Sequence, residues 1–221
     1  MPDPLDSFDA RQSDGARTLI IACGALARET LAVIEANGLS HVDVTCIAAS
    51  LHNRPERIPG AVEAKIEAAR GKYDVIAAAL ADCGTGGALD KVLERHGIPR
   101  LAGPHCYQFY ATEPVFSRLS DEEPGTLYLT DFLARHFDAL VWRGLGLDRF
   151  PHLLGSYFGN YRRVVYLAQS DDPVLDRMAA EAADRLGLDY ERVATGYGEL
   201  ATFIAAAAAN DHNRIPQEQP A

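Results

Sequence analysis

Short apolar runs alternate with amphipathic segments along most of the chain. The first run covers residues 18–23 and is followed by Gly24 and an amphipathic stretch over 25–36. A short apolar run bounded by turn residues predicts a buried strand, and apolar residues spaced three and four apart predict a helix. The folded part therefore begins as a strand, a tight turn and a helix.

The same alternation recurs toward the C-terminus. Most strand candidates are apolar throughout, which is typical of parallel strands covered on both faces. The predicted fold is α/β, a doubly wound, mostly parallel, Rossmann-like sheet with a helical insertion near 131–158. Whether the strands form one sheet or two lobes is left open by the pattern. The expected strands are 18–23, 42–48, 73–81, 99–102, 126–129, 163–168 and 190–194. The expected helices are 25–36, 55–70, 87–95, 131–142, 150–158, 173–186 and 199–209, with one or two more in 105–119.

The length and the two ends bound the domain organisation. A chain of 221 residues is within the range of one single-core domain. Residues 1–16 and 210–221 are polar and contain prolines, which predicts flexible tails around a single α/β domain over 17–209.

Charge and hydropathy limit the expected partners and the expected cellular location. A formal net charge of −10 opposes binding to a polyanion, so nucleic acid is not an expected partner. The first residues lack the basic and then apolar order of a signal peptide, and no apolar run reaches the roughly 20 residues that a membrane span needs. We expect a cytoplasmic protein without a membrane segment.

The four cysteines are the main chemical feature. They are too few and too dispersed for a secreted disulfide scaffold. Cys23 and Cys83 end the first and third predicted strands, and Cys106 follows the fourth, whereas Cys46 lies inside the second and is expected in the core. Ligands of open α/β sheets bind beyond the carboxyl ends of the strands. Three thiols are therefore expected along one edge of the sheet.

Converging thiols beside an imidazole favour zinc, because thiolate and imidazole are its preferred ligands. The predicted metal ligands are Cys23, Cys83, His105 and Cys106. Adjacent residues often cannot both reach one ion, so water or substrate is an alternative to His105. Two other interpretations stay open. In the first, the thiols are only small residues packed at strand ends. In the second, one thiol is a redox or nucleophilic group, and Cys83 is favoured because it precedes a helix.

Two further features are candidates. The loop of Gly84, Thr85, Gly86 and Gly87 offers backbone amides to an anion or cofactor, although it has neither P-loop nor dinucleotide spacing, and a tight turn explains it as well. Glu29, six residues after Cys23, is a candidate proton carrier near the thiols, and a solvated helix face is the alternative.

Several segments together resemble the bacterial and archaeal family called domain of unknown function 1638. The resemblance covers about residues 17–205. It rests on these segments: Ile21-Ala22-Cys23-Gly24 with Glu29, Asp82-Cys83-Gly84-Thr85-Gly86, the Cys106 segment, 124–130 and 163–167. The family's cysteines resemble Cys23, Cys83 and Cys106. Many members carry His-Asp-Cys where this chain reads Pro104-His105-Cys106, so the fourth ligand is where the chain departs from the pattern.

Members of this family are often encoded beside corrinoid-dependent methyltransferases, which implies work in or beside one-carbon methyl transfer. The leading hypothesis is a zinc protein with a thiolate-rich site in that setting, as a methyltransferase or its accessory. A corrinoid would then come through a partner, either a corrinoid protein or a methyltransferase. The alternatives are a non-catalytic accessory that binds a corrinoid protein or its cofactor, and an anion-binding or thiol-dependent oxidoreductase acting on a small molecule.

Overall fold

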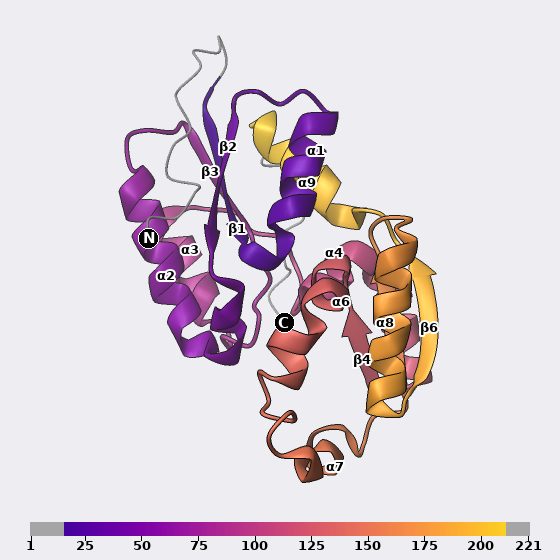
Figure 1. The fold of residues 1–221 in the computed structure, drawn as a ribbon. Helices are drawn as coiled ribbons and strands as arrows, with labels where there is room; N and C mark the ends of the chain where they lie inside the picture. Colours follow the sequence, from indigo (N-terminus) through magenta and orange to yellow (C-terminus); the bar gives the residue numbers. More distant parts are fainter. Residues whose placement is uncertain (1–15, 211–221) are drawn as a thin grey trace. The chain divides into compact units, whose positions relative to one another are not determined.

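The computed structural model describes residues 16–210, and these form two sheets that each contain three parallel strands (Figure 1). All but one residue of each predicted tail lies outside this range. The first sheet has the order β2-β1-β3, with β1 (Thr18–Cys23), β2 (Val42–Ile47) and β3 (Val75–Ala79). The second has the order β4-β5-β6, with β4 (Thr126–Leu129), β5 (Arg163–Ala168) and β6 (Asp189–Ala194). The α/β, doubly wound prediction is confirmed, and the strands form two sheets.

Each sheet belongs to its own compact unit. Within the described residues, one unit combines 16–106 with 199–210, and the other is Tyr107–Gly198. The domain expected over 17–209 therefore contains two compact units, one for each sheet. No helix within 16–210 is both long and apolar enough to cross a membrane.

The first sheet is covered on both faces. Its central strand β1 is buried along its whole length, as an apolar run predicts. Helices α1 (Ala27–Ala36) and α9 (Gly198–Ala208) cover one face, and α2 (Ile58–Ala69) and α3 (Ala88–His96) cover the other (Figure 1). Helix α3 ends at Gly97, which adopts the left-handed conformation that glycine tolerates best.

The strand predicted over 99–102 is wrong as a full strand. Only one isolated bridge joins Ala78 to Arg100, and the segment then follows the chain after β3 through single backbone hydrogen bonds. Pro99 has no N–H to donate, which limits a regular ladder here. The segment nevertheless runs beside residues 78–83 and shapes the edge of the sheet.

The second sheet divides its side chains between two faces. Val164 and Tyr166 pack on α6 (Asp131–Phe137), α7 (Leu154–Phe158) and α8 (Pro173–Leu186). Val165 and Leu167 pack instead with residues of α4 (Cys106–Ala111) and α5 (Glu113–Glu122). This alternation follows from the two-residue period of a strand.

The predicted helical insertion lies between β4 and β5. It begins with α6, but the helix expected over 131–142 changes to a π-helical turn at Asp138–Trp142. A 3₁₀ turn at Pro151–Leu153 then leads into α7. The insertion thus consists of short helices that cover one face of the second sheet.

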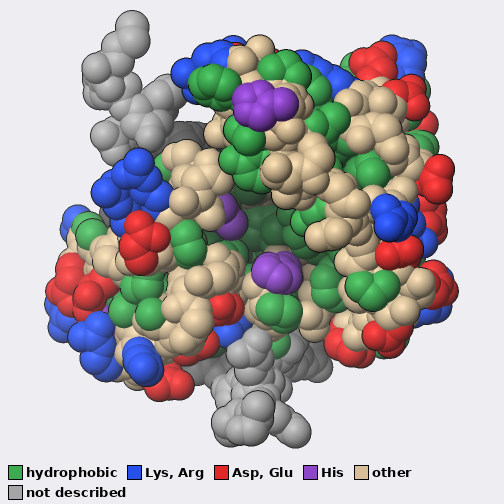
Figure 2. Space-filling view, turned by 90° about the horizontal axis from the view of Figure 1, so that it is seen from below, with side chains coloured by type: hydrophobic (Ala, Val, Ile, Leu, Met, Phe, Trp, Pro, Cys, Tyr) green, Lys and Arg blue, Asp and Glu red, His purple; other side chains and the backbone are tan. Residues whose placement is uncertain are grey.

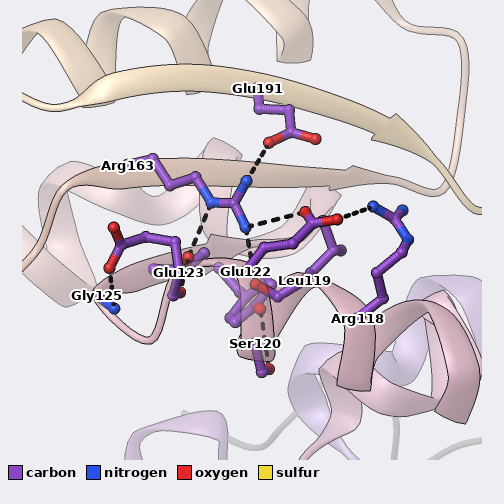
Figure 3. Close-up of polar contacts among 10 residues, drawn as sticks. Arg118, Leu119, Ser120, Glu122, Glu123, Gly125, Arg163 and Glu191 are labelled. Atoms are coloured by element: carbon purple, nitrogen blue, oxygen red, sulfur yellow. Dashed lines mark hydrogen bonds and ion pairs between the residues drawn. The ribbon is translucent and has the colours of Figure 1, made fainter.

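Arg163 ties together the amino end of the second sheet (Figure 3). Its side chain is only 16% exposed. The guanidinium donates to Thr126 Oγ1 at 3.0 Å, to Glu191 Oε2 at 2.7 Å and to the Leu119 carbonyl at 2.8 Å. One side chain therefore links all three strands to α5.

We expect Arg163→Met to lower the free energy of unfolding by about 2–3 kcal/mol, because Glu191 and two other acceptors lose a charged donor. Urea unfolding followed by circular dichroism measures this change. Arg162→Met is the matched control, because the Arg162 side chain is exposed and, among the described residues, donates to the neighbouring Tyr161 carbonyl at 3.4 Å. Equal stabilities for the two variants would refute the role of Arg163.

Candidate functional site at the first sheet edge

The turns that leave the first sheet lie along one edge because its strands end at nearly the same level. Ala22 of β1 is opposite Cys46 of β2 and Ala79 of β3. Residues that follow these three positions therefore emerge together, as expected for the carboxyl edge of a parallel sheet.

Cys23 is the buried residue of this edge. It ends β1, is buried, and caps the following 3₁₀ turn, where its Sγ accepts the Ala25 N–H at 3.3 Å. A Cβ on Gly24 would lie 3.2 Å from the Ile47 carbonyl oxygen. The close approach of this turn to the end of β2 therefore favours glycine after the cysteine.

His52 places an imidazole beside Cys23, and the sequence analysis did not select it. It lies in the 3₁₀ turn after β2 (Ala49–Asn53), with Nδ1 at 3.9 Å from Cys23 Sγ and 3.0 Å from the Ala49 carbonyl oxygen. Because a carbonyl only accepts, the second contact places the proton on Nδ1 and leaves the lone pair on Nε2. Applying the strand-end rule to β2 as well would have found this residue.

Cys83 is held in an unusual backbone conformation. Its φ is +53°, inside a glycine-rich loop whose next residue, Gly84, has a φ of +82°. A side chain other than glycine at such a φ costs about 1 kcal/mol, so the conformation alone would favour glycine. Cys83 therefore carries a backbone strain that glycine at this position would not have.

The two thiols of the edge are protonated at neutral pH. Burial raises the pKa of Cys23 to about 12, and Cys83 and Cys46 act in the same direction. Burial also raises the pKa of Cys83 to about 11, reinforced by Asp82 and opposed by a backbone hydrogen bond with Ala81 and by Arg100. Cys83 and Cys46 thus both lie within electrostatic range of Cys23. Cys46, expected in the core, is partly exposed.

The loop after Cys83 uses its polar groups internally. The Asp82 carboxylate accepts the Thr85 hydroxyl at 2.5 Å, the Gly87 N–H at 2.9 Å and the Gly86 N–H at 3.2 Å. Partial burial acts to raise the pKa of Asp82, but these donors and Arg100 hold it below its usual value. An external anion at Gly86 and Gly87 would have to displace this carboxylate.

His105 and Cys106 follow on the neighbouring segment. His105 is exposed, and exposed histidine side chains are visible in the space-filling view (Figure 2). Burial of part of the ring lowers the pKa of His105; Asp82 opposes this shift and His52 adds to it. Cys106 begins α4 and is partly exposed.

Glu29 lies in the first turn of α1 and is buried. The solvated helix face considered as an alternative is therefore wrong for this residue. Its suggested role as a proton carrier stays a prediction.

The side chains that could bind a metal ion are not preassembled. Among residues 16–210, no group of three or more His, Cys, Asp or Glu side chains is arranged to hold a metal ion. The four-ligand centre of Cys23, Cys83, His105 and Cys106 stays a prediction. The geometry does bring His52 to Cys23, and Cys83 interacts electrostatically with Cys23 and His105 with His52.

A family model described as "Protein of unknown function (DUF1638)" matches residues 46–204, more than half of the chain. The chain belongs to the DUF1638 family. This confirms the family inferred from the cysteine and glycine segments. The match includes His52, Cys83, His105 and Cys106, whereas Cys23 and Glu29 precede the matched residues.

Comparisons with curated proteins and with solved structures give little further information on this DUF1638 protein. No curated protein matches it. Among solved structures, ornithine carbamoyltransferase from Pyrococcus furiosus aligns with 11% identity and a TM-score of 0.24. The alignment covers 80% of this chain and 54% of that structure, so the chain spans about half the length of the enzyme.

Proposed function

We propose that this DUF1638 protein binds one zinc ion at the carboxyl edge of its first sheet. The proposed ligands are the thiolates of Cys23 and Cys83 and the imidazoles of His52 and His105. The observation that carries the proposal is the contact of His52 with the buried Cys23 thiol at 3.9 Å, beside a second cysteine held at positive φ.

The types of side chain fit zinc. Two sulfur and two nitrogen donors form one of the common ligand sets of structural zinc sites. In the metal-free chain the His52 Nδ1–H donates to the Ala49 carbonyl, and the same nitrogen faces Cys23 Sγ, so Nδ1 would bind the ion once the ring leaves the carbonyl and its proton moves to Nε2. Cys106, adjacent to His105, is the competing fourth donor.

The donors are apart without an ion, and the exposure of the imidazoles explains how they would meet. His52 and His105 are both exposed, so their rings can change rotamer at small cost. Cys23 is held at the end of β1, and Cys83 in the loop after β3, where its N–H donates to the Pro104 carbonyl. We infer that the rings turn onto the thiols when the ion binds.

The raised thiol pKa values favour a metal site over a nucleophilic or redox cysteine. A nucleophile needs a thiolate near neutral pH, and a thiol with a pKa of about 11 or 12 supplies almost none. A bound cation stabilises the thiolate directly and removes this restriction. The thiol-dependent oxidoreductase is therefore the weaker alternative.

The setting in methyl transfer rests on the family resemblance. Bound at this edge, zinc supplies Lewis acidity that keeps a thiol ionised at neutral pH. The exposed imidazoles lie on the solvent side, where one of them can give way to an incoming ligand, and this suits the leading hypothesis of a methyltransferase or its accessory. A partner that carries a corrinoid remains part of this proposal.

The pH dependence of zinc affinity tests the proposal. Between pH 7 and 9 both thiols are protonated in the metal-free protein, so each binding event releases two protons. We expect the apparent zinc affinity to rise about 100-fold for each pH unit between pH 7 and 9, because it is inversely proportional to the square of the proton concentration. Titration against a chromophoric chelator measures this slope.

Three variants complete the experiment. Cys46→Ser should keep the wild-type slope, because Cys46 is not a proposed ligand. Cys106→Ser and His105→Asn distinguish the two candidates for the fourth ligand. His105→Asn should weaken zinc binding, and Cys106→Ser should leave it unchanged. A wild-type affinity that does not change with pH would contradict binding through the two thiols.

A further inference from the structure

Arg100 is a buried cation behind the candidate site. Its side chain is 8% exposed and forms a two-pronged ion pair with Asp90 of α3, with Nε–Oδ1 at 2.5 Å and Nη2–Oδ2 at 3.2 Å. A paired arrangement of this kind fixes the guanidinium plane. The arginine is therefore anchored to a helix outside the two loops that carry Cys83 and His105.

The remaining donors of Arg100 hold the second of these loops. Nη1 donates to the Leu101 carbonyl at 2.6 Å and to the Gly103 carbonyl at 3.3 Å. Gly103 is buried and has a φ of +112°, so the chain turns sharply at the point that the arginine holds. The turn leads directly into Pro104, His105 and Cys106.

The turn at Gly103 also fixes the backbone of Cys83. The Asp82 N–H donates to the Gly103 carbonyl at 3.3 Å, and the Cys83 N–H donates to the Pro104 carbonyl at 3.1 Å. These two hydrogen bonds continue the contact between 78–83 and 99–104 beyond the end of β3. Arg100, the Gly103 turn and the Cys83 backbone thus form one connected chain of polar contacts.

We propose that Arg100 is the positioning residue of this site, because it clamps the Gly103 turn to α3 and through that turn fixes Cys83 and His105 on one edge. The inference rests on the proposed zinc site for its functional meaning. The positioning itself is a property of the metal-free protein and is measured without an ion.

Amide hydrogen exchange of the full-length metal-free chain tests the positioning. We expect Arg100→Met to speed exchange at the amides of Asp82 and Cys83 about tenfold, since their acceptors lose support, while Ile20 and Ile21 of the buried strand β1 stay within twofold. Arg95→Met is the matched control, because Arg95 is an exposed arginine of α3 paired with Glu63. Arg100→Lys should give an intermediate rate, since lysine keeps the charge but not the fork.

Cobalt(II), used as a coloured substitute for zinc, supplies the readout at the site. The sulfur-to-cobalt absorption counts thiolate ligands, and we expect its intensity per bound ion to halve in Arg100→Met as Cys83 leaves the site. Unchanged exchange at Asp82 and Cys83, an equal rise in β1, or undiminished absorption would overturn the proposal. Local exchange that rises in a protein whose wild type binds no cobalt would support the positioning and refute the metal site.

Discussion

Cys83→Gly is expected to lower zinc affinity about a hundredfold or more without unfolding the protein. Zinc sites of four ligands contribute about 10–16 kcal/mol of binding free energy, so one thiolate accounts for about 3 kcal/mol. Glycine suits the φ of +53° at this position, which offsets the small loss of packing. The free energy of unfolding should therefore stay within about 1 kcal/mol of the wild type.

The measurement is a chelator competition at pH 8 beside urea unfolding of the same samples. Cys46→Ala serves as the control, because it removes a partly exposed thiol from β2 that is not a proposed ligand. Its affinity should equal that of the wild type. Zinc binding by Cys83→Gly at wild-type strength would show that Cys83 is not a ligand.

Asp131→Ala is expected to give a large loss of stability, about 3–5 kcal/mol. Asp131 is buried at the junction of β4 and α6, where its carboxylate accepts the Tyr166 hydroxyl at 2.7 Å, the Gln169 N–H at 3.0 Å and the Ser170 hydroxyl at 2.5 Å. Alanine leaves three donors without their acceptor, two of them on buried residues. The carboxylate thus joins the ends of β4 and β5.

Urea unfolding followed by circular dichroism measures the effect of Asp131→Ala. Asp121→Ala, at an exposed position of α5, should change stability by less than about 0.5 kcal/mol. Tyr166→Phe removes one of the three donors and should fall between the two. A loss below about 1 kcal/mol for Asp131→Ala would mean that this network contributes little.

Local signals predicted much of the fold. The bounds of β1, β5 and α8 agree with the expected ranges, because each has clear limits in the sequence. For α8, the Asp172 side chain accepts the Val174 N–H, Pro173 occupies the first turn, and Gly187 ends the helix in the left-handed conformation. Such signals act within a few residues, so they can be recognised in the sequence alone.

The division into two sheets depends on pairing between distant strands, which the hydrophobic pattern does not encode. The site was predicted in part for a similar reason. Cys23 and Cys83 are predicted from their places at strand ends, and His105 from its place beside Cys106. His52 follows β2 in the same way, and its contact with Cys23 distinguishes it from the other residues of that turn. Arg100 lies among ordinary residues in the sequence, and its importance follows from burial and from its pairing with Asp90.

The zinc content of the purified full-length chain tests the central claim most directly. Protein loaded with zinc, dialysed against a weak chelator and analysed for metal should contain one zinc per chain, and the Cys23→Ala, Cys83→Gly double variant should contain none. A wild-type chain that retains no zinc, or a double variant that retains as much as the wild type, would contradict a zinc site at the edge of the first sheet.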